Sequence, residues 1–287
     1  MSSQFDLVVH GPAFKRDHAT AIARICNVQE RAIRAFEHSA RIPINEPDPV
    51  MRAAVAAHCQ QTNLDHAFVP PGKKLSDFGL LAMDMDSTLI TIECIDEIAD
   101  MQGIKPQVAA ITASAMRGEI DFPESLRRRV SLLAGLPQEA LQRVYDERLR
   151  LSPGAETMLA RLKGLNIKTL LVSGGFTFFT ERLKARLGLD HTLSNTLEIA
   201  DGKLTGKVLG SIVDAQAKAS RLAELRTALN LQHDQVIAMG DGANDLLMLA
   251  EAGVSIAYRA KPVVREHATY SFNHAGLDGV LALYDPR

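Results

Sequence analysis

The sequence predicts an α/β protein: a doubly wound parallel sheet with a helical insertion, preceded by a small α+β module. Short apolar runs occur at Leu80–Met83, Thr169–Val172, Val236–Met239 and Val254–Ala257. Runs of this length and composition are typical of buried parallel strands. The first three end in loops rich in Gly or Asp, and helical segments separate them. Sheets of this kind bind ligands at the carboxyl ends of their strands, so these loops are the expected site.

The composition is that of a globular protein with a sizeable core. The chain has 287 residues, enough for one large domain or two ordinary ones, with 46% hydrophobic and 23% charged residues. Lys and Arg number 32 and Asp and Glu 34, giving a net charge of -2. This balance argues against nucleic acid as a partner.

Cysteine usage and the N-terminus predict a cytoplasmic protein. The three cysteines are odd in number and match no zinc-binding spacing, which favours buried thiols in a reducing compartment. The N-terminus lacks the charged and apolar regions of a signal peptide, and no apolar run is long enough to span a membrane.

Residues 1–75 are expected to form the N-terminal module. The expected elements are strands at Phe5–His10 and His66–Val69, helices at His18–Val28 and Pro49–Gln61, an ambiguous segment at Ala32–Ile42 for which we favour a strand, and a linker at Pro70–Lys74. This α+β pattern resembles the ACT fold, which suits a regulatory module or one that forms a homodimer. A packing appendage without a ligand is the alternative.

The remainder, residues 76–287, is expected to form the catalytic domain. Between Glu93 and Ser152 the sequence shows only helical patterns, broken by glycines and a proline. A helical insertion directly after the first strand-end loop can cover the site, and we call residues 93–152 the cap.

Two acidic loops are the strongest chemical signal. Asp84 and Asp86 follow the first apolar run, and Asp241 and Asp245 follow the run at Val236–Met239. Carboxylates at a strand end can bind a divalent cation and can act as nucleophile and acid/base. Either pair alone is as readily explained by capping of a helix N-terminus. Their occurrence at two strand ends of one sheet favours a shared metal site.

Two weaker signals complete the pattern. Ser173 and Gly174 follow the second apolar run, where a hydroxyl and glycine amides can hold a phosphate, although such a sequence is also a common turn. Lys218 lies in a helical stretch, where a lone lysine is usually solvated. It gains importance as the cation that carboxylates and phosphate would require.

In this order the motifs resemble the haloacid dehalogenase-like superfamily. They are Asp84-Met85-Asp86-Ser87-Thr88, Ser173, Lys218 and Gly240-Asp241-Gly242-Ala243-Asn244-Asp245. Within it the chain is similar to the phosphoserine phosphatases, through Glu93 in Thr91–Glu97, Arg129 in Ser125–Val130, and Ser173–Phe176. The resemblance covers Phe78 to the C-terminus and leaves the N-terminal module undefined.

The resemblance implies a role for each residue. Asp84 would be the nucleophile that forms an aspartyl-phosphate, and Asp86 the acid and then the base. Mg2+ would be bound by Asp84, the Asp86 carbonyl and Asp241, and Asp245 would order the metal loop. The phosphoryl group would be held by Ser173, Gly174 and Lys218. Asn244 would orient the substrate, while Glu93 would pair with the substrate ammonium and Arg129 with the substrate carboxylate. Met116 and Phe122 are expected either at the cap side of the pocket or in the core.

The resemblance thus implies a Mg2+-dependent phosphatase that converts O-phospho-L-serine to L-serine and phosphate, the last step of serine biosynthesis. One alternative keeps the fold but transfers phosphate to another alcohol or acts on another small phosphorylated metabolite. Another alternative is a non-catalytic amino-acid sensor. The intact pair of Asp84 and Asp86 argues against a sensor.

Overall fold

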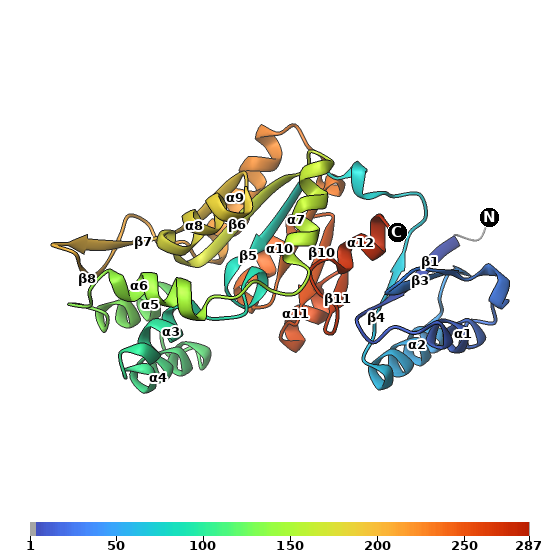
Figure 1. The fold of residues 1–287 in the computed structure, drawn as a ribbon, viewed down its shortest axis with the longest axis horizontal. Helices are drawn as coiled ribbons and strands as arrows, with labels where there is room; N and C mark the ends of the chain where they lie inside the picture. Colours follow the sequence, from blue (N-terminus) through green and yellow to red (C-terminus); the bar gives the residue numbers. More distant parts are fainter. Residues whose placement is uncertain (1–3, 287) are drawn as a thin grey trace.

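A computed structural model describes residues 4–286, which form two separate β-sheets (Figure 1). The smaller sheet is antiparallel, with strand order β2-β3-β1-β4. Its elements are β1 (Gln4–His10), α1 (Arg16–Ile25), the 3-10 turn η1 (Glu30–Ala32), β2 (Arg34–Ala35), β3 (Ser39–Asn45), α2 (Pro49–Thr62) and β4 (Asp65–Val69). Both helices lie on one face, as Figure 1 shows, and pack there over an apolar core that includes Leu7, Ile22 and Val55. This βαββαβ order agrees with the expected α+β pattern.

Two elements of this module differ from expectation. The segment Ala32–Ile42, expected as one strand, contains the end of η1 and then two paired strands, β2 and β3. Helix α1 starts and ends earlier than the expected His18–Val28. Helix α2 begins as its sequence predicts, because the Asp48 side chain accepts a hydrogen bond from the Met51 amide and Pro49 occupies the first turn.

The larger sheet has seven strands in the order β11-β10-β9-β5-β6-β7-β8. They are β5 (Leu80–Asp84), β6 (Lys168–Phe176), β7 (His191–Ala200), β8 (Lys203–Leu209), β9 (Val236–Gly240), β10 (Val254–Tyr258) and β11 (Tyr270–Phe272). All neighbours pair in parallel except β7 and β8. From central β5 the chain passes to β6 on one side and later to β9 on the other. The resulting crevice at the carboxyl ends of β5 and β9 is where such sheets bind ligands.

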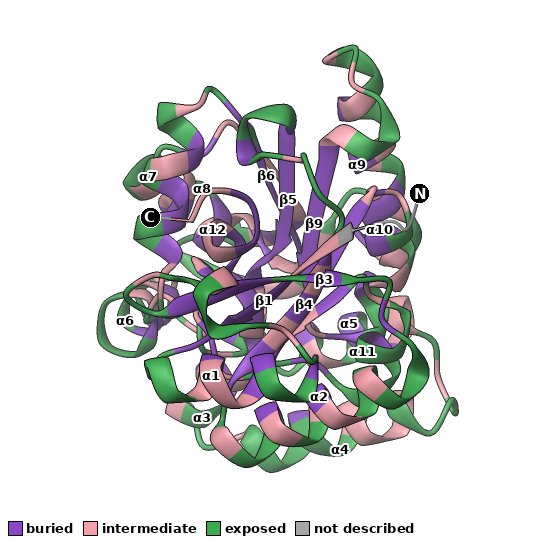
Figure 2. Cartoon of the chain, turned by 90° about the vertical axis from the view of Figure 1, so that its right-hand side faces the viewer, coloured by how far each residue is buried: buried purple, intermediate pink, exposed green. Residues whose placement is uncertain are grey.

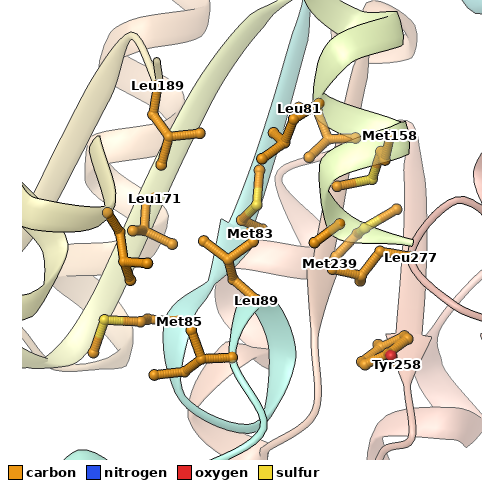
Figure 3. Packing of buried hydrophobic residues seen from close by; sticks show 14 of the residues in the cluster. Leu81, Met83, Met85, Leu89, Met158, Leu171, Leu189, Met239, Tyr258 and Leu277 are labelled. Atoms are coloured by element: carbon orange, nitrogen blue, oxygen red, sulfur yellow. The ribbon is translucent and has the colours of Figure 1, made fainter. Parts of the chain in front are cut away.

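Both faces of this sheet are buried, as a doubly wound fold requires. Leu81, Met83 and Leu171 point to one face and pack with Met158 and Leu189 (Figure 3). The helices contributing to this side are α7 (Ala155–Gly164), α8 (Thr177–Leu187) and α12 (Gly279–Tyr284). The alternate strand residues face α9 (Ala215–Ala228), α10 (Leu246–Ala250) and α11 (Pro262–His267). Strand periodicity therefore assigns neighbouring residues to two cores.

The cap consists of helices, as its sequence predicts. They are α3 (Cys94–Met101), α4 (Lys105–Met116), α5 (Phe122–Ser131), α6 (Glu139–Arg143) and the π-helical turn η4 (Val144–Arg148). Apolar cap residues such as Leu126 and Val130 belong to the same cluster as the sheet core. The hairpin of β7 and β8, which the sequence analysis did not predict, extends along the cap in Figure 1. The Gly135 amide donates to the Leu204 carbonyl at 2.8 Å, so the hairpin is tied to the cap.

The small sheet also packs against the large domain. Val8, Ala67 and Val69 point away from α1 and α2 and join the main core. Strands β1, β3 and β4 are largely buried in Figure 2. Buried Asp65 accepts hydrogen bonds from three consecutive backbone amides, those of residues 273–275, at 2.8–3.0 Å. No helix among residues 4–286 is long and apolar enough to cross a membrane.

Asp65→Ala should destabilise the protein by removing the acceptor of three backbone amides at the contact between the two sheets. A buried donor without a partner costs about 1–3 kcal/mol, so we expect the free energy of unfolding to fall by about 2–4 kcal/mol. Urea denaturation followed by circular dichroism measures it. Asp17→Ala is the control, because Asp17 lies in the same module and its side chain is exposed. Equal stability of both variants would show that the amides find other partners.

Candidate active site

The loop after β5 turns sharply and brings Asp84 and Asp86 to the crevice. Asp86 keeps extended backbone angles, and Ser87 takes the left-handed region at φ 58°, which reverses the chain. An Asp86 carboxylate oxygen then accepts a hydrogen bond from the Cys94 amide at 3.1 Å, at the start of α3. The first residues of the cap therefore hold the orientation of Asp86.

Lys218 joins the two acidic loops beneath the crevice. Its ammonium group donates to Asp84 at 2.5 Å and to Asp245 at 2.8 Å, and all three side chains are buried. Burial lowers the pKa of Lys218, but the charges of Asp84 and Asp245 raise it overall. Lys218 is therefore cationic and directs one oxygen of Asp84.

Asp241, Asp245 and Asp84 form an acidic cluster that can bind a divalent cation. One oxygen from each of them lies within 4.8 Å of the others. The second Asp245 oxygen already accepts from the amides of Asp241 and Gly242, at 3.2 and 3.1 Å. With Lys218 on its first oxygen, Asp245 suits ordering of the loop, and Asp84 and Asp241 keep oxygens available for a cation.

Strand β6 provides the third wall of the site. It remains extended through Ser173 and Gly174, with irregular pairing to β7 between Val172 and Phe176. Ser173 lies between the Gly175 amide, which donates to its hydroxyl at 2.8 Å, and Asp86, at 3.5 Å. A Cβ at Gly175 would lie 2.8 Å from an Asp86 oxygen, so only glycine permits this close approach.

The cap closes the site into a cleft of about 560 Å³. Its lining contains the expected residues Asp84, Asp86, Glu93, Met116, Phe122, Arg129, Gly174, Asp241 and Asn244. Ser173, Lys218 and Asp245 are buried behind this surface. The structure thus brings together, from five separate segments, every side chain that the sequence analysis singled out.

Burial and like charges raise the pKa values of the acidic residues of the cleft. Burial, and secondarily the charge of Glu93, raises the pKa of Asp86 to about 7. Burial also raises the pKa of Asp84 well above its usual range, although Lys218 opposes this. A carboxyl that titrates near neutral pH can both donate and accept a proton during turnover, which suits Asp86 for acid/base catalysis.

Two residues of the site had no signal in the sequence analysis. Buried Asn195, on β7, donates to the Gly174 carbonyl at 2.8 Å and accepts from the Val213 amide at 2.8 Å, so it fixes the backbone of the β6 loop. Lys261, in the loop after β10, lines the cleft beside Asp241. Both come from segments outside the recognised motifs.

Comparison with known proteins agrees with this geometry. The haloacid dehalogenase-like hydrolase model matches residues 81–250. A phosphoserine phosphatase from Polaromonas sp. is 55% identical over 218 residues, 74% of this chain and 92% of that protein. Among solved structures, a haloacid dehalogenase family hydrolase from Salmonella enterica serovar Typhi has a TM-score of 0.89 at 34% identity, covering 98% of both chains. A probable phosphoserine phosphatase from Vibrio cholerae has a TM-score of 0.83 at 38% identity, covering 97% of this chain and 86% of that one.

Binding of a divalent cation should strengthen as the pH rises. Burial, and secondarily Asp245, raises the pKa of Asp241 to about 6, so this carboxyl is protonated at acidic pH and must lose its proton to bind a cation. Calorimetric titration should show affinity falling about tenfold per pH unit below 6 for each proton displaced. An affinity that does not change between pH 5 and 8 would contradict this assignment.

Proposed function

The chain belongs to the haloacid dehalogenase-like hydrolase family, and from this we propose that it is a phosphatase that hydrolyses O-phospho-L-serine to L-serine and phosphate. The main support is one arrangement: Asp84, held by buried Lys218, faces a cleft that also contains Glu93 and Arg129. The first two suit a phosphoryl group. The second two offer an anion and a cation, which suits the two charges of an amino acid.

In the proposed reaction an Asp84 oxygen attacks phosphorus, and the bond from phosphorus to the serine oxygen breaks. Asp86 gives its proton to that departing oxygen. Asp86 then takes a proton from water, which attacks the aspartyl-phosphate and releases phosphate. Lys218, Ser173 and the Gly174 backbone would hold the phosphoryl oxygens. Phosphoryl transfer depends chiefly on such positioning and charge neutralisation.

Mg2+ is the cation we propose for the acidic cluster. Asp84, the Asp86 carbonyl and Asp241 would hold it, and Asp245 would order its loop. Oxygen ligands of this kind suit Mg2+. When bound, Mg2+ would reduce the repulsion between the nucleophile and the phosphate.

The amino-acid end would bind between the cap and the metal loop. Glu93 lies at the first turn of the cap, where the Ser87 hydroxyl donates to it at 2.7 Å. Arg129, on α5, is half-buried, whereas its neighbours Arg127 and Arg128 are exposed. We propose that Glu93 pairs with the substrate ammonium, that Arg129 pairs with its carboxylate and that Asn244 helps to orient it. Such a reaction would complete serine biosynthesis.

We further propose that residues 1–75 form a separate module and that residues 76–287 form the phosphatase domain. Residues 93–152 are the cap of this domain. The ferredoxin-like order of the small sheet supports this division. A homodimer formed through this module remains a prediction. The edge strand β2 could pair with the same strand of a second copy.

A phosphate-release screen over phosphorylated amino acids and sugars, with and without Mg2+, tests the proposed function. We expect the highest kcat/KM with O-phospho-L-serine and loss of turnover when the cation is chelated. An added acceptor alcohol should not capture the phosphate. Preference for a sugar phosphate, or release independent of any divalent cation, would refute the proposal.

Asp84→Asn should abolish turnover and leave the fold intact, because an amide is a poor nucleophile of nearly the same size. With labelled O-phospho-L-serine, rapid acid quenching should trap phosphate on the wild-type protein and none on the variant. Circular dichroism provides the control for folding. Substantial turnover by the variant would exclude a covalent intermediate on Asp84.

Arg129→Ala should impair phosphoserine hydrolysis selectively, because it removes a charged partner of the carboxylate. We expect kcat/KM to fall by about 10- to 100-fold for O-phospho-L-serine. For p-nitrophenyl phosphate, which has no carboxylate, it should change by less than about threefold. Arg128→Ala is the matched control, since that side chain is exposed and pairs with Glu124. Equal losses for both substrates would make Arg129 structural or a phosphate ligand.

A further inference from the structure

Lys261 is a cation of the cleft to which no role has been assigned so far. It follows β10 and directly precedes α11, at the carboxyl edge of the sheet beside β9. Its side chain lines the same cleft as Asp84, Glu93 and Arg129. It comes from the sheet domain, whereas Arg129 comes from the cap.

The backbone places Lys261 firmly. Its amide donates to the Asp241 carbonyl at 3.1 Å, which ties the loop after β10 to the loop of the acidic cluster. Two residues earlier, Arg259 has a left-handed φ of 46° and its amide donates to the Phe272 carbonyl at 2.7 Å. A non-glycine residue in this region is strained, and such strain persists where surrounding structure determines it, often at functional sites.

The ammonium group of Lys261 is available to a ligand. Within residues 4–286 no side chain pairs with it through a hydrogen bond or an ion pair. Its charge nevertheless acts on two carboxyls of the cleft. Enclosure raises the pKa of Glu93, and the charges of Arg129 and Lys261 oppose this rise. Lys261 acts on Asp241 in the same direction. Lys261 is therefore close to both Glu93 and the acidic cluster, and it lines the same cleft.

The side chains that line the cleft carry more negative than positive charge, so each lining cation matters for binding an anionic substrate. Lining carboxylates are Asp84, Asp86, Glu93, Asp96 and Asp241, and the lining cations in the described part of the chain are Arg129 and Lys261. Lys218 lies below the surface and is already paired with two carboxylates. An anionic substrate needs compensating charge inside such an acidic cleft. A carboxylate on the carbon that bears the ammonium would lie next to Glu93, and so near both cations that line the cleft.

We propose that Lys261 is a substrate-binding residue that pairs with the carboxylate of the amino-acid substrate, opposite Arg129. This inference rests on the proposed function and deepens it. One carboxylate then bridges the cap and the sheet domain, since each supplies one of its two cations. Bound substrate itself would hold the cleft closed, and a phosphate ester without a carboxylate would not.

Kinetics of Lys261→Met with two matched substrates test this role. O-phosphoethanolamine retains the phosphate and the ammonium of O-phospho-L-serine and lacks only its carboxylate. KM for O-phospho-L-serine should rise by about 10- to 100-fold, whereas kcat/KM for O-phosphoethanolamine should change by less than about twofold. Lys261→Arg keeps the charge and should restore most of the affinity. Arg265→Met removes a cation from α11, the short helix that Lys261 precedes, at a side chain lining a different cleft, and should leave the kinetics with both substrates unchanged.

The variants of Lys261 and Arg129 should also be coupled. If both cations bind one carboxylate, Arg129→Ala combined with Lys261→Met should lose less kcat/KM than the product of the two single losses. If Lys261→Met lowered kcat/KM equally for both substrates, Lys261 would bind the phosphate or stabilise its loop. If kcat/KM changed for neither substrate, Lys261 would have no role in binding. Each result overturns the proposal. Failure of the proposed function is distinguishable, because the wild-type protein would then not prefer O-phospho-L-serine.

Discussion

The buried Lys218 ammonium between Asp84 and Asp245 is the interaction on which the site depends. It joins helix α9 to the ends of β5 and β9, the two strands that border the crevice. Burying three charges is costly, and well-packed apolar residues often stabilise a protein as much as a buried ion pair does. The cluster is therefore better explained by chemistry than by stability. Lys218 fixes the Asp84 carboxylate in one orientation by holding one of its oxygens. Without this contact the carboxylate would be solvated and free to rotate.

The rest of the crevice is built around that fixed carboxylate. Asp245 orders the β9 loop through two amides, and Asp86 reaches Ser173 because Gly175 has no side chain. Three strands thus place polar atoms around one point, while their apolar residues pack into the two cores on either side of the sheet. The catalytic edge and the hydrophobic core are two ends of the same strands, so the core determines the geometry of the site.

Much of this arrangement could be predicted from the sequence, because it depends on local patterns. The four apolar runs became β5, β6, β9 and β10, and the acidic residues after two of them lie together since parallel strands end at one edge. The β7–β8 hairpin was missed although Asp201-Gly202 is a strong hairpin signal, and both residues have positive φ, at 50° and 73°. Strand β11 has three residues, too few for a periodic pattern. Asn195 and Lys261 could not be identified, because their importance arises from contacts between segments distant in the sequence.

The attachment of the cap has a mechanical consequence. The chain enters and leaves the cap side by side, where Ile90 and Leu151 form a β-bridge. The hairpin of β7 and β8 holds it at a second place, through backbone hydrogen bonds of Leu204 and Gly202 to residues 135–138. A lid with one hinge swings wide, whereas a lid fixed at two places can only flex. The hairpin therefore restrains the cap, and we expect the cap to flex about these two attachments rather than to swing away from the sheet.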